Sequence, residues 1–328
     1  NFVWMFIYRG EDPPLPDERA LDFLAAHEFN FVRIPTDYRY WTNDFDYLQP
    51  NEDVWKALDR YLEACRSRGI HMCLNIHRGP GYCINRNNIE KHNLWLDKEA
   101  QDGFTYQWRK LAERYKGVPS SELSFDLINE PPFVGQYGMT REIHANVMRR
   151  VVKEIREIDS DRRIVLDGLA GGNLAMPELA DLGVVQSCRG YAPMAISHYK
   201  ASWWPEYETA KDVPYYPGIE FDGRIWDRQG LTDFYQPWRE MENTGTEIHC
   251  GEFGCYIETP HEVALAWLGD LMSLWKEWGW GYSMWNFEGN FGIIGHGRKG
   301  ARIENVMGYD VDRDMLELMM TNRVTDLL

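Results

Sequence analysis

The segment from Leu127 to Pro132, Leu-Ile-Asn-Glu-Pro-Pro, places two polar side chains where an apolar run stops. The apolar run, residues 123–128, is typical of a short buried strand. Pro131 cannot donate a hydrogen bond to a neighbouring strand, so the strand must end at or near Glu130. In parallel α/β folds ligands bind at this end of the strands. Glu130 is therefore a candidate catalytic residue, although this segment alone would equally suit a carboxylate in a solvated turn.

A second carboxylate, Glu252, ends another apolar run in the sequence His-Cys-Gly-Glu-Phe-Gly. Hydrolysis of a glycosidic bond needs two carboxyl groups, one on each side of the scissile bond. A separation of about 5–5.5 Å between them leads to retention through a covalent glycosyl-enzyme intermediate. The sequence does not give this distance, but the two residue types suit this reaction.

Strand-like and helix-like segments alternate from one end of the chain to the other. From the apolar runs we expect strands at residues 2–7, 29–34, 70–76, 123–129, 164–167, 184–191, 247–252 and 281–285. We expect helices at residues 17–28, 53–68, 101–116, 139–158, 177–181, 231–243, 260–278 and 313–327. This alternation favours a parallel sheet with crossover helices. Eight strand-helix units predict an α/β fold of the closed (β/α)8 TIM-barrel type.

The chain length fits one such barrel with a few long loops. The 328 residues exceed the ~250 that a (β/α)8 barrel typically needs. We find no linker or low-complexity segment that would separate a second domain, so we predict one catalytic domain over residues 1–328. The longest irregular stretch, residues 192–230, is rich in Trp, Tyr and Pro. A loop of that length in a compact domain is usually functional.

Polar or aromatic side chains stand at the ends of six predicted strands. They are Arg33 on the second strand, His77 on the third, Asn129 and Glu130 on the fourth, Tyr191 on the sixth, Glu252 on the seventh and Trp285 on the eighth. A barrel brings these ends to the face where barrel enzymes hold their active sites. We therefore expect the two carboxylates to face each other there. Any one of these side chains could be purely structural, but six strand ends suited to one reaction are hard to explain that way.

The combination of Asn-Glu-Pro, the distant Gly-Glu-Phe-Gly and Trp285 resembles glycoside hydrolase family 5, the retaining barrel enzymes that include cellulase-like endoglucanases. The resemblance runs from Phe29 to Trp285. It implies that Glu130 is the general acid/base and Glu252 the nucleophile. It also implies that Asn129 binds the sugar 2-hydroxyl, Arg33 keeps Glu252 ionised, His77 bonds in the reacting-sugar subsite, Tyr191 contacts Glu252, and Trp285 is a stacking floor for the reacting sugar.

The sixth strand departs from the family, which usually ends it with His-x-Tyr. Aligning Tyr191-Ala-Pro with the family places Arg189 where the histidine would stand. A guanidinium close to Glu130 would lower the pKa of that carboxyl, which works against a general acid. Either Arg189 is turned away and paired with another acid, or His198 from the following loop occupies the place. We favour the second alternative.

The third strand also departs, because Arg78 follows His77 where many members have a second histidine. We expect this difference to affect substrate contacts.

Composition narrows the partners. A net charge of −16 argues against nucleic acid and anionic membrane surfaces. There is no run of about 18 apolar residues, so we expect no membrane span. The six cysteines match no zinc pattern and are expected to be free thiols. We expect no cofactor and no metal, and a monomer whose partner is a polysaccharide. The chain begins at Asn1, which suits either a removed signal peptide or a trimmed chain, and we expect a secreted enzyme.

Aromatic residues are frequent in the segments that follow the second, third, fourth and sixth strands. They are Trp41, Tyr82, Phe133, Trp203, Trp204, Tyr207, Tyr215, Tyr216 and Trp226. β-1,4-Linked glucose presents flat apolar faces on which such rings stack. We expect Trp41, Tyr82, Trp203 and Trp204, together with His198, to bind substrate, while some of the other rings only pack the long loop. A row of rings on both sides of the carboxylates predicts an endo-β-1,4-glucanase.

Three alternatives remain open at this stage. The same chemistry could act on mannan, xylan or xyloglucan, or as an exo-β-glucosidase, because strand-end motifs report the reaction rather than the polymer. A non-catalytic polysaccharide-binding barrel would typically lack one of the two carboxylates. A metal-dependent barrel hydrolase would need a ligand pattern such as an early His-x-His, and the first predicted strand has no histidine.

Overall fold

A computed structural model describes residues 1–85, 87–206 and 212–324. The chain divides into two compact units. The amino-terminal unit contains residues 2–187 and 241–247, and the carboxyl-terminal unit contains residue 1 with residues 188–240 and 248–328. Strand β5 (Val185–Gly190) begins in the first unit and ends in the second. The single domain expected from the sequence stays a prediction.

The amino-terminal unit is built on parallel strands. These are β1 (Phe31–Asp37), β2 (His71–Arg78), β3 (Leu123–Asp126) and β4 (Arg163–Asp167), followed by β5 in the order β1-β2-β3-β4-β5. Almost every residue of these strands is buried, which is typical of a parallel sheet covered on both faces. Because the strands are parallel, their carboxyl ends share one edge of the sheet.

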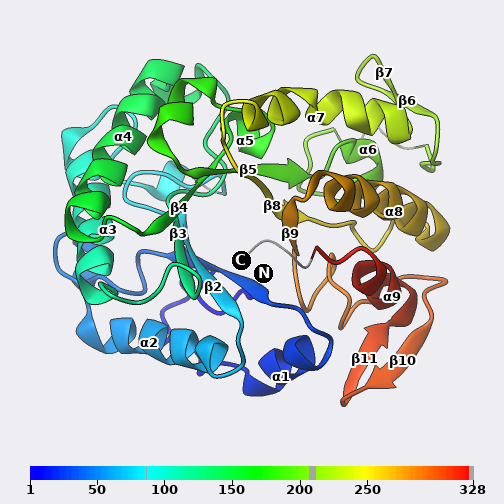
Figure 1. Ribbon diagram of the computed structural model, residues 1–328, viewed down its shortest axis with the longest axis horizontal. Helices are drawn as coiled ribbons and strands as arrows, with labels where there is room; N and C mark the ends of the chain where they lie inside the picture. Colours follow the sequence, from blue (N-terminus) through cyan, green and yellow to red (C-terminus); the bar gives the residue numbers. More distant parts are fainter. Residues whose placement is uncertain (86, 207–211, 325–328) are drawn as a thin grey trace. The chain divides into compact units, whose positions relative to one another are not determined.

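Helices alternate with these strands along the chain, and α2, α3 and α4 are drawn on the outer side of the sheet in Figure 1. They are α1 (Glu18–Ala26), α2 (Glu52–Arg66), α3 (Lys98–Arg114), α4 (Arg141–Ile158) and the short α5 (Leu169–Gly172). Short 3-10 turns lie at Asn43–Phe45, Asn87–Ile89, Gln136–Gly138 and Pro177–Leu182. The start of α2 is fixed by the Asn51 side chain, which accepts bonds from the backbone N–H groups of Asp53 and Val54.

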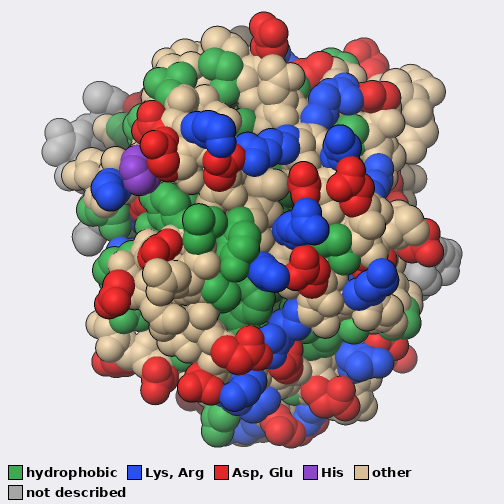
Figure 2. Space-filling model, turned by 90° about the vertical axis from the view of Figure 1, so that its left-hand side faces the viewer, with side chains coloured by type: hydrophobic (Ala, Val, Ile, Leu, Met, Phe, Trp, Pro, Cys, Tyr) green, Lys and Arg blue, Asp and Glu red, His purple; other side chains and the backbone are tan. Residues whose placement is uncertain are grey.

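Opposite charges stand next to each other on α3 and α4. Arg109 pairs with Glu154, and Arg150 pairs with Asp102. Figure 2 shows Lys and Arg side chains interleaved with Asp and Glu over the face of the molecule that it presents. Exposed pairs of this kind contribute little to stability, so the apolar faces beneath them hold the helices in place.

The carboxyl-terminal unit continues the parallel sheet pattern in the order β5-β8-β9, with β8 at Ile248–Phe253 and β9 at Gly281–Met284. Its helices are α6 (Met194–Ser197), α7 (Arg228–Glu242), α8 (His261–Trp278) and α9 (Arg313–Thr321). Two small antiparallel hairpins join them: β6 (Ile219–Phe221) with β7 (Arg224–Trp226), and β10 (Ile303–Val306) with β11 (Tyr309–Asp312). The second hairpin lies beside α9 (Figure 1).

Seven of the eight predicted strands are present within a few residues of their expected bounds. The strand expected at residues 2–7 is not formed, and only an isolated parallel bridge joins Met5 to Thr36. Aromatic packing holds this segment instead, since Trp4 contacts the rings of Phe2 and Tyr61. Neither hairpin was predicted from the sequence. The last helix, expected at residues 313–327, ends at Thr321, and residues 325–327 of that expected range lie outside the described residues.

The long loop expected at residues 192–230 is partly structured, because it contains α6 and the β6–β7 hairpin. All six cysteines are buried, and none forms a disulfide with another described residue. Among the helices within the described ranges, none combines the length and the hydropathy that crossing a bilayer demands.

Candidate active site

Arg33, on β1, is the centre of a buried polar network in the amino-terminal unit. Its side chain is about 1% exposed. Nε donates to Asp126 Oδ2 at 2.7 Å, and Nη2 donates to Asn129 Oδ1 at 2.8 Å and to Asp167 Oδ2 at 3.5 Å. A guanidinium removed from water needs such partners, because an uncompensated buried charge is costly. The network therefore fixes the orientation of the Asn129 side chain.

Asn129 and His77 lie together, as the sequence predicts for the ends of neighbouring strands. Both side chains are buried. Since Asn129 Oδ1 accepts a bond from Arg33, its Nδ2 group is directed elsewhere and lies 3.4 Å from His77 Nε2. Asn85 Nδ2 approaches the same His77 nitrogen at 3.5 Å, and the ring of Phe6 packs edge-on against His77. The amide of Asn129 thus presents N–H groups rather than its oxygen toward His77.

Glu130 follows β3, and its backbone is clamped from several sides. Its N–H donates to Asp167 Oδ2 at 3.0 Å, and its carbonyl accepts a bond from the Tyr82 hydroxyl at 2.7 Å. The carbonyl oxygens of residues 131–132 accept bonds from the N–H groups of residues 170–171. Glu130 has φ of 46°, a left-handed conformation that non-glycine residues rarely adopt. Such a conformation persists only where the surroundings impose it, and these bonds do so.

Glu252, on β8 in the carboxyl-terminal unit, is a buried carboxylate with a named partner on each oxygen. Its side chain is about 5% exposed. The Tyr191 hydroxyl donates to Oε2 at 3.1 Å, which is the contact that the family resemblance implies for Tyr191. Nη2 of Arg189, a fully buried side chain on β5, lies 3.6 Å from Oε1. The opposite charges offset part of each other's desolvation cost.

Arg189 is therefore paired with an acid other than Glu130, which is the first of the two alternatives drawn from the sequence. His198 packs its ring edge-on against Tyr191 and lies 2.8 Å from the Ser197 hydroxyl. Burial lowers the pKa of His198 to about 4, so this ring is neutral at ordinary pH. The second alternative, in which His198 occupies the family's histidine place next to Glu130, stays a prediction.

Two tryptophans of the carboxyl-terminal unit keep part of their rings accessible. Trp285 is half-buried, and its backbone N–H donates to the carbonyl of Phe253 at the end of β8. Trp203 is 57% exposed, and its ring contacts Tyr256 and His198. Both rings retain a surface on which a sugar could stack.

Three of the aromatic residues expected to bind substrate are instead part of the core. Trp41 and Tyr82 are fully buried, and Trp204 is 6% exposed. Trp41 Nε1 donates to Gln107 Oε1, and Trp204 packs in a cluster with Ala195 and Ala201. A buried ring has no free face for a sugar, so we correct the expectation for these three residues. Burying such rings removes a large apolar surface from water, which stabilises the fold.

The remaining aromatic residues divide between packing and exposure. Trp226 is buried and donates to the carbonyl of Phe221, and the Tyr216 hydroxyl donates to Asp270, so both hold the structured loop together. Phe133 and Tyr215 are each 56% exposed. Tyr207 lies outside the described residues.

Sequence reasoning missed Asp126 and Asp167, the two buried carboxylates around Arg33. Each is the last residue of an otherwise largely apolar strand. An acid at such a position must find a cation or several donors when the strand is buried. That signal was present in the sequence, but it does not say which cation is the partner.

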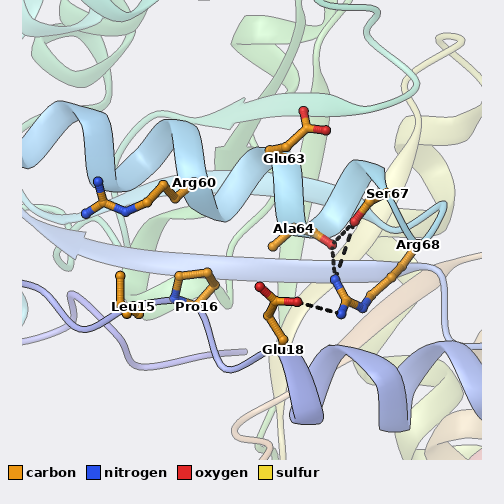
Figure 3. A pocket seen from close by; sticks show the side chains of 8 residues that line it. All are labelled: Leu15, Pro16, Glu18, Arg60, Glu63, Ala64, Ser67 and Arg68. Atoms are coloured by element: carbon orange, nitrogen blue, oxygen red, sulfur yellow. Dashed lines mark hydrogen bonds and ion pairs between the residues drawn. The ribbon is translucent and has the colours of Figure 1, made fainter.

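A surface hollow of about 370 Å³ lies between the segment before α1 and the second half of α2. Leu15, Pro16 and Arg60 are among its lining residues, and Arg68 reaches across it to Glu18 (Figure 3). The end of α2 leads into the start of β2, whereas His77 lies near the other end of that strand. The hollow thus contains none of the candidate site residues of the amino-terminal unit.

Comparison with known proteins places the chain in a family. The profile of the family described as cellulase (glycosyl hydrolase family 5) matches residues 6–291. The chain belongs to this family and is a glycoside hydrolase of the cellulase type. A crystal structure titled as that of a glycoside hydrolase is 57% identical, with a TM-score of 0.96 over 98% of each chain.

More distant proteins agree with this class. Endoglucanase C of Acetivibrio thermocellus is 28% identical over 309 residues, which cover 86% of this chain and 87% of the relative. The crystal structure of endoglucanase Cel5A from Thermotoga maritima is 21% identical, with a TM-score of 0.77 over 96% of this chain and 94% of that one. The parallel strands and alternating helices, with these matches, confirm the predicted (β/α)8 TIM-barrel fold.

We predict that Tyr82 acts by holding the backbone of Glu130. Burial raises the pKa of Tyr82, so its hydroxyl stays protonated as a donor to the Glu130 carbonyl. Tyr82→Phe should lower the free energy of unfolding by about 0.5–1.5 kcal/mol, the net value of one hydrogen bond. It should also lower kcat on soluble β-glucan by about 10-fold, because a misplaced general acid loses efficiency.

Tyr61→Phe is the matched control. Tyr61 is also fully buried, and its hydroxyl donates to the carbonyl of Pro14 at the same distance of 2.7 Å. Urea unfolding should show similar losses for both variants, while steady-state kinetics should show a loss of kcat only for Tyr82→Phe. Equal kcat values in the two variants would mean that Tyr82 does not position Glu130.

Proposed function

We propose that this chain is a retaining endo-β-1,4-glucanase in which Glu252 is the nucleophile and Glu130 the general acid/base. The observation that carries the proposal is the state of Glu252 in a member of glycosyl hydrolase family 5. Its carboxylate is buried, a tyrosine hydroxyl holds one oxygen and a guanidinium faces the other. Both partners hold the carboxylate in a fixed direction, which is what a carboxylate nucleophile requires.

The reaction follows from these two residues. The ionised Glu252 attacks the anomeric carbon while Glu130 gives its proton to the leaving glycosidic oxygen, so that a glycosyl ester on Glu252 forms. Glu130, now ionised, takes a proton from a water molecule that attacks the same carbon and releases Glu252. Before the attack, the Tyr191 hydroxyl donates a hydrogen bond to Oε2 of the ionised Glu252.

Asn129 and two tryptophans, one half-buried and one exposed, are the substrate contacts of this proposal. Arg33 donates to the oxygen of the Asn129 amide, so we expect the amide to meet the sugar 2-hydroxyl with an N–H group rather than with that oxygen. Hydrogen bonds at that hydroxyl strengthen in the transition state. Trp285 offers a stacking surface to the reacting sugar, and Trp203 offers one to a further sugar.

Glucan is proposed as the substrate because relatives at 28% identity over most of the chain are named endoglucanases. The alternatives, which are mannan, xylan, xyloglucan and exo-acting release of glucose, share the same chemistry. A polymer of this kind lies outside cells, so we also propose that the enzyme is secreted. A monomer remains our proposal for its oligomeric state.

A panel of soluble polysaccharides tests the substrate. We expect a rapid fall in the viscosity of carboxymethyl cellulose and mixed-linkage glucan, with early release of oligosaccharides of several lengths. A clear preference for mannan or xylan, or the release of glucose alone from chain ends, would contradict the proposal.

Glu130→Ala should affect substrates according to their leaving groups. The phenolate of an aryl cellobioside made from a strongly acidic phenol leaves without protonation. The leaving chain of a glucan needs a proton from Glu130. We therefore expect kcat/KM to fall at least 100-fold more on glucan than on the activated aryl substrate, within the ~10²–10⁴-fold range of general acid catalysis. Steady-state kinetics on the two substrates measure this ratio, and similar losses on both would remove Glu130 from the acid role.

Arg189→Met should lower kcat/KM on soluble β-glucan together with the free energy of unfolding, because Glu252 Oε1 loses the buried guanidinium that lies 3.6 Å away and offsets its desolvation cost. Arg189→Lys keeps a positive charge and should restore part of both quantities. Steady-state kinetics and urea unfolding measure the two losses. If the methionine and lysine variants lose activity to the same extent, the charge of Arg189 has no part in holding Glu252.

A further inference from the structure

Three side chains from separate segments of the carboxyl-terminal unit converge at the start of α9. They are His261, the first residue of α8, Asp312, the last residue of β11, and Asp314, in the first turn of α9. One possible metal-ligand atom from each lies within 4.8 Å of the other two. His261 and Asp312 are buried, whereas Asp314 is partly exposed, so the cluster is reachable from one side.

His261 lies between the two carboxylates. Its Nδ1 is 3.7 Å from Asp312 Oδ2, and its Nε2 is 3.3 Å from Asp314 Oδ2. In a tetrahedral site with metal–ligand bonds of ~2.0–2.1 Å, the ligand atoms stand about 3.3 Å apart. One ion takes only one of the two His261 nitrogens, and the three ligand atoms lie within 4.8 Å of one another, so the side chains would close in by up to about 1.5 Å to fill the site.

One buried nitrogen of this cluster lacks an ordinary hydrogen bond. Among the described residues, His261 Nδ1 has no partner with suitable hydrogen-bond geometry, although it is shielded from solvent. Asp312 is fully buried: its Oδ1 accepts the N–H of Met315, and its Oδ2 has His296 Nε2 at 3.2 Å. Buried polar atoms are nearly always satisfied, so the unpartnered nitrogen indicates that a ligand belongs beside it.

Neighbouring groups hold the carboxylates in place. His296 Nε2 lies 3.2 Å from Asp312 Oδ2. Its Nδ1 accepts the N–H of Arg298, so the proton of a neutral His296 ring is on Nε2, facing the carboxylate. Arg302 Nε donates to Asp314 Oδ1, which leaves Oδ2 for the cluster. Outer partners of this kind orient the ligands of metal sites.

We propose that His261, Asp312 and Asp314 bind one divalent transition-metal ion, with Zn²⁺ as the best fit. Zn²⁺ accepts imidazole nitrogen and carboxylate oxygen together, and a water molecule can supply a fourth position. Ca²⁺ and Mg²⁺ prefer oxygen ligands alone, so the histidine disfavours them. Two carboxylates balance the charge of the ion.

The bound ion has a structural role. It links the start of α8 to the start of α9. Through Asp312 it also holds the segment around Ile293, because the backbone N–H of Asp312 donates to the Ile293 carbonyl. Phe291, two residues earlier, contacts the rings of Tyr191 and Trp203. The ion therefore stabilises the segment that packs against two residues of the proposed substrate site.

Calorimetric titration of the full chain with Zn²⁺ tests the proposal. The protein is first treated with a chelator and dialysed into metal-free buffer. We expect saturable binding of one equivalent of Zn²⁺ and a rise in Tm, because an ion that binds only the folded state stabilises it. His261→Gln and Asp314→Asn should each weaken Zn²⁺ binding at least about 10-fold, a loss that even outer-partner changes reach in metal sites.

Two control variants should bind Zn²⁺ as the wild type does. His27→Gln changes a histidine at the end of α1, and Asp310→Asn changes an exposed carboxylate on the same hairpin as Asp312. Asp314 is partly exposed, so Asp314→Asn keeps the test valid if His261→Gln does not fold. The proposal is overturned if one equivalent of Zn²⁺ does not bind, if both cluster variants bind it unchanged, or if Ca²⁺ or Mg²⁺ binds equally tightly.

Discussion

The burial of the Arg33 guanidinium is the constraint on which the candidate site residues of the amino-terminal unit depend. A cation with almost no solvent must be surrounded by acceptors, and these are Asp126 and Asn129, at and just after the end of β3, and Asp167 at the end of β4. Asp167 then uses the same oxygen to accept the backbone N–H of Glu130. One buried charge thus fixes the Asn129 amide and, through Asp167, anchors the Glu130 backbone. This anchoring offsets the free-energy cost of the left-handed conformation of Glu130. The left-handed conformation of Glu130 is held by hydrogen bonds to its backbone.

The carboxyl-terminal unit repeats this principle with the charges exchanged. There the buried group is the carboxylate of Glu252, and the groups that hold it are Arg189 and Tyr191 from one strand end. Arg189 stands where the family usually has a histidine, and its pairing with Glu252 gives the substitution a physical reason. A neutral His198, packed on Tyr191, adds no competing charge beside this pair. In each unit, the candidate site residues therefore rely on desolvated ion pairs at the ends of buried strands.

The sequence predicted the elements whose signals are local. Apolar runs predicted seven strands, but the prolines after Glu130 did not mark the end of β3, which stops four residues before Glu130, at Asp126. It failed where side-chain direction is decided by tertiary packing. Trp41 and Tyr82 lie in segments after strand ends, and nothing local shows that their rings turn into the core. The acids Asp126 and Asp167 were visible, but their shared partner became clear only from the fold. Residues 2–7 are apolar and were therefore expected to form a strand. Instead their aromatic rings pack against each other, and the backbone forms only an isolated bridge.

Trapping of the glycosyl-enzyme tests the central claim, that Glu252 is the nucleophile of a retaining reaction. A 2-deoxy-2-fluoro cellobioside with a dinitrophenolate leaving group should form the intermediate and hydrolyse slowly, because fluorine destabilises the oxocarbenium-like transition state while the good leaving group keeps the first step fast. Mass spectrometry of a protease digest should then find the fluorosugar on the peptide that contains Glu252. A sugar attached to another residue, or no covalent adduct in an enzyme that still hydrolyses the unfluorinated cellobioside, would contradict the account.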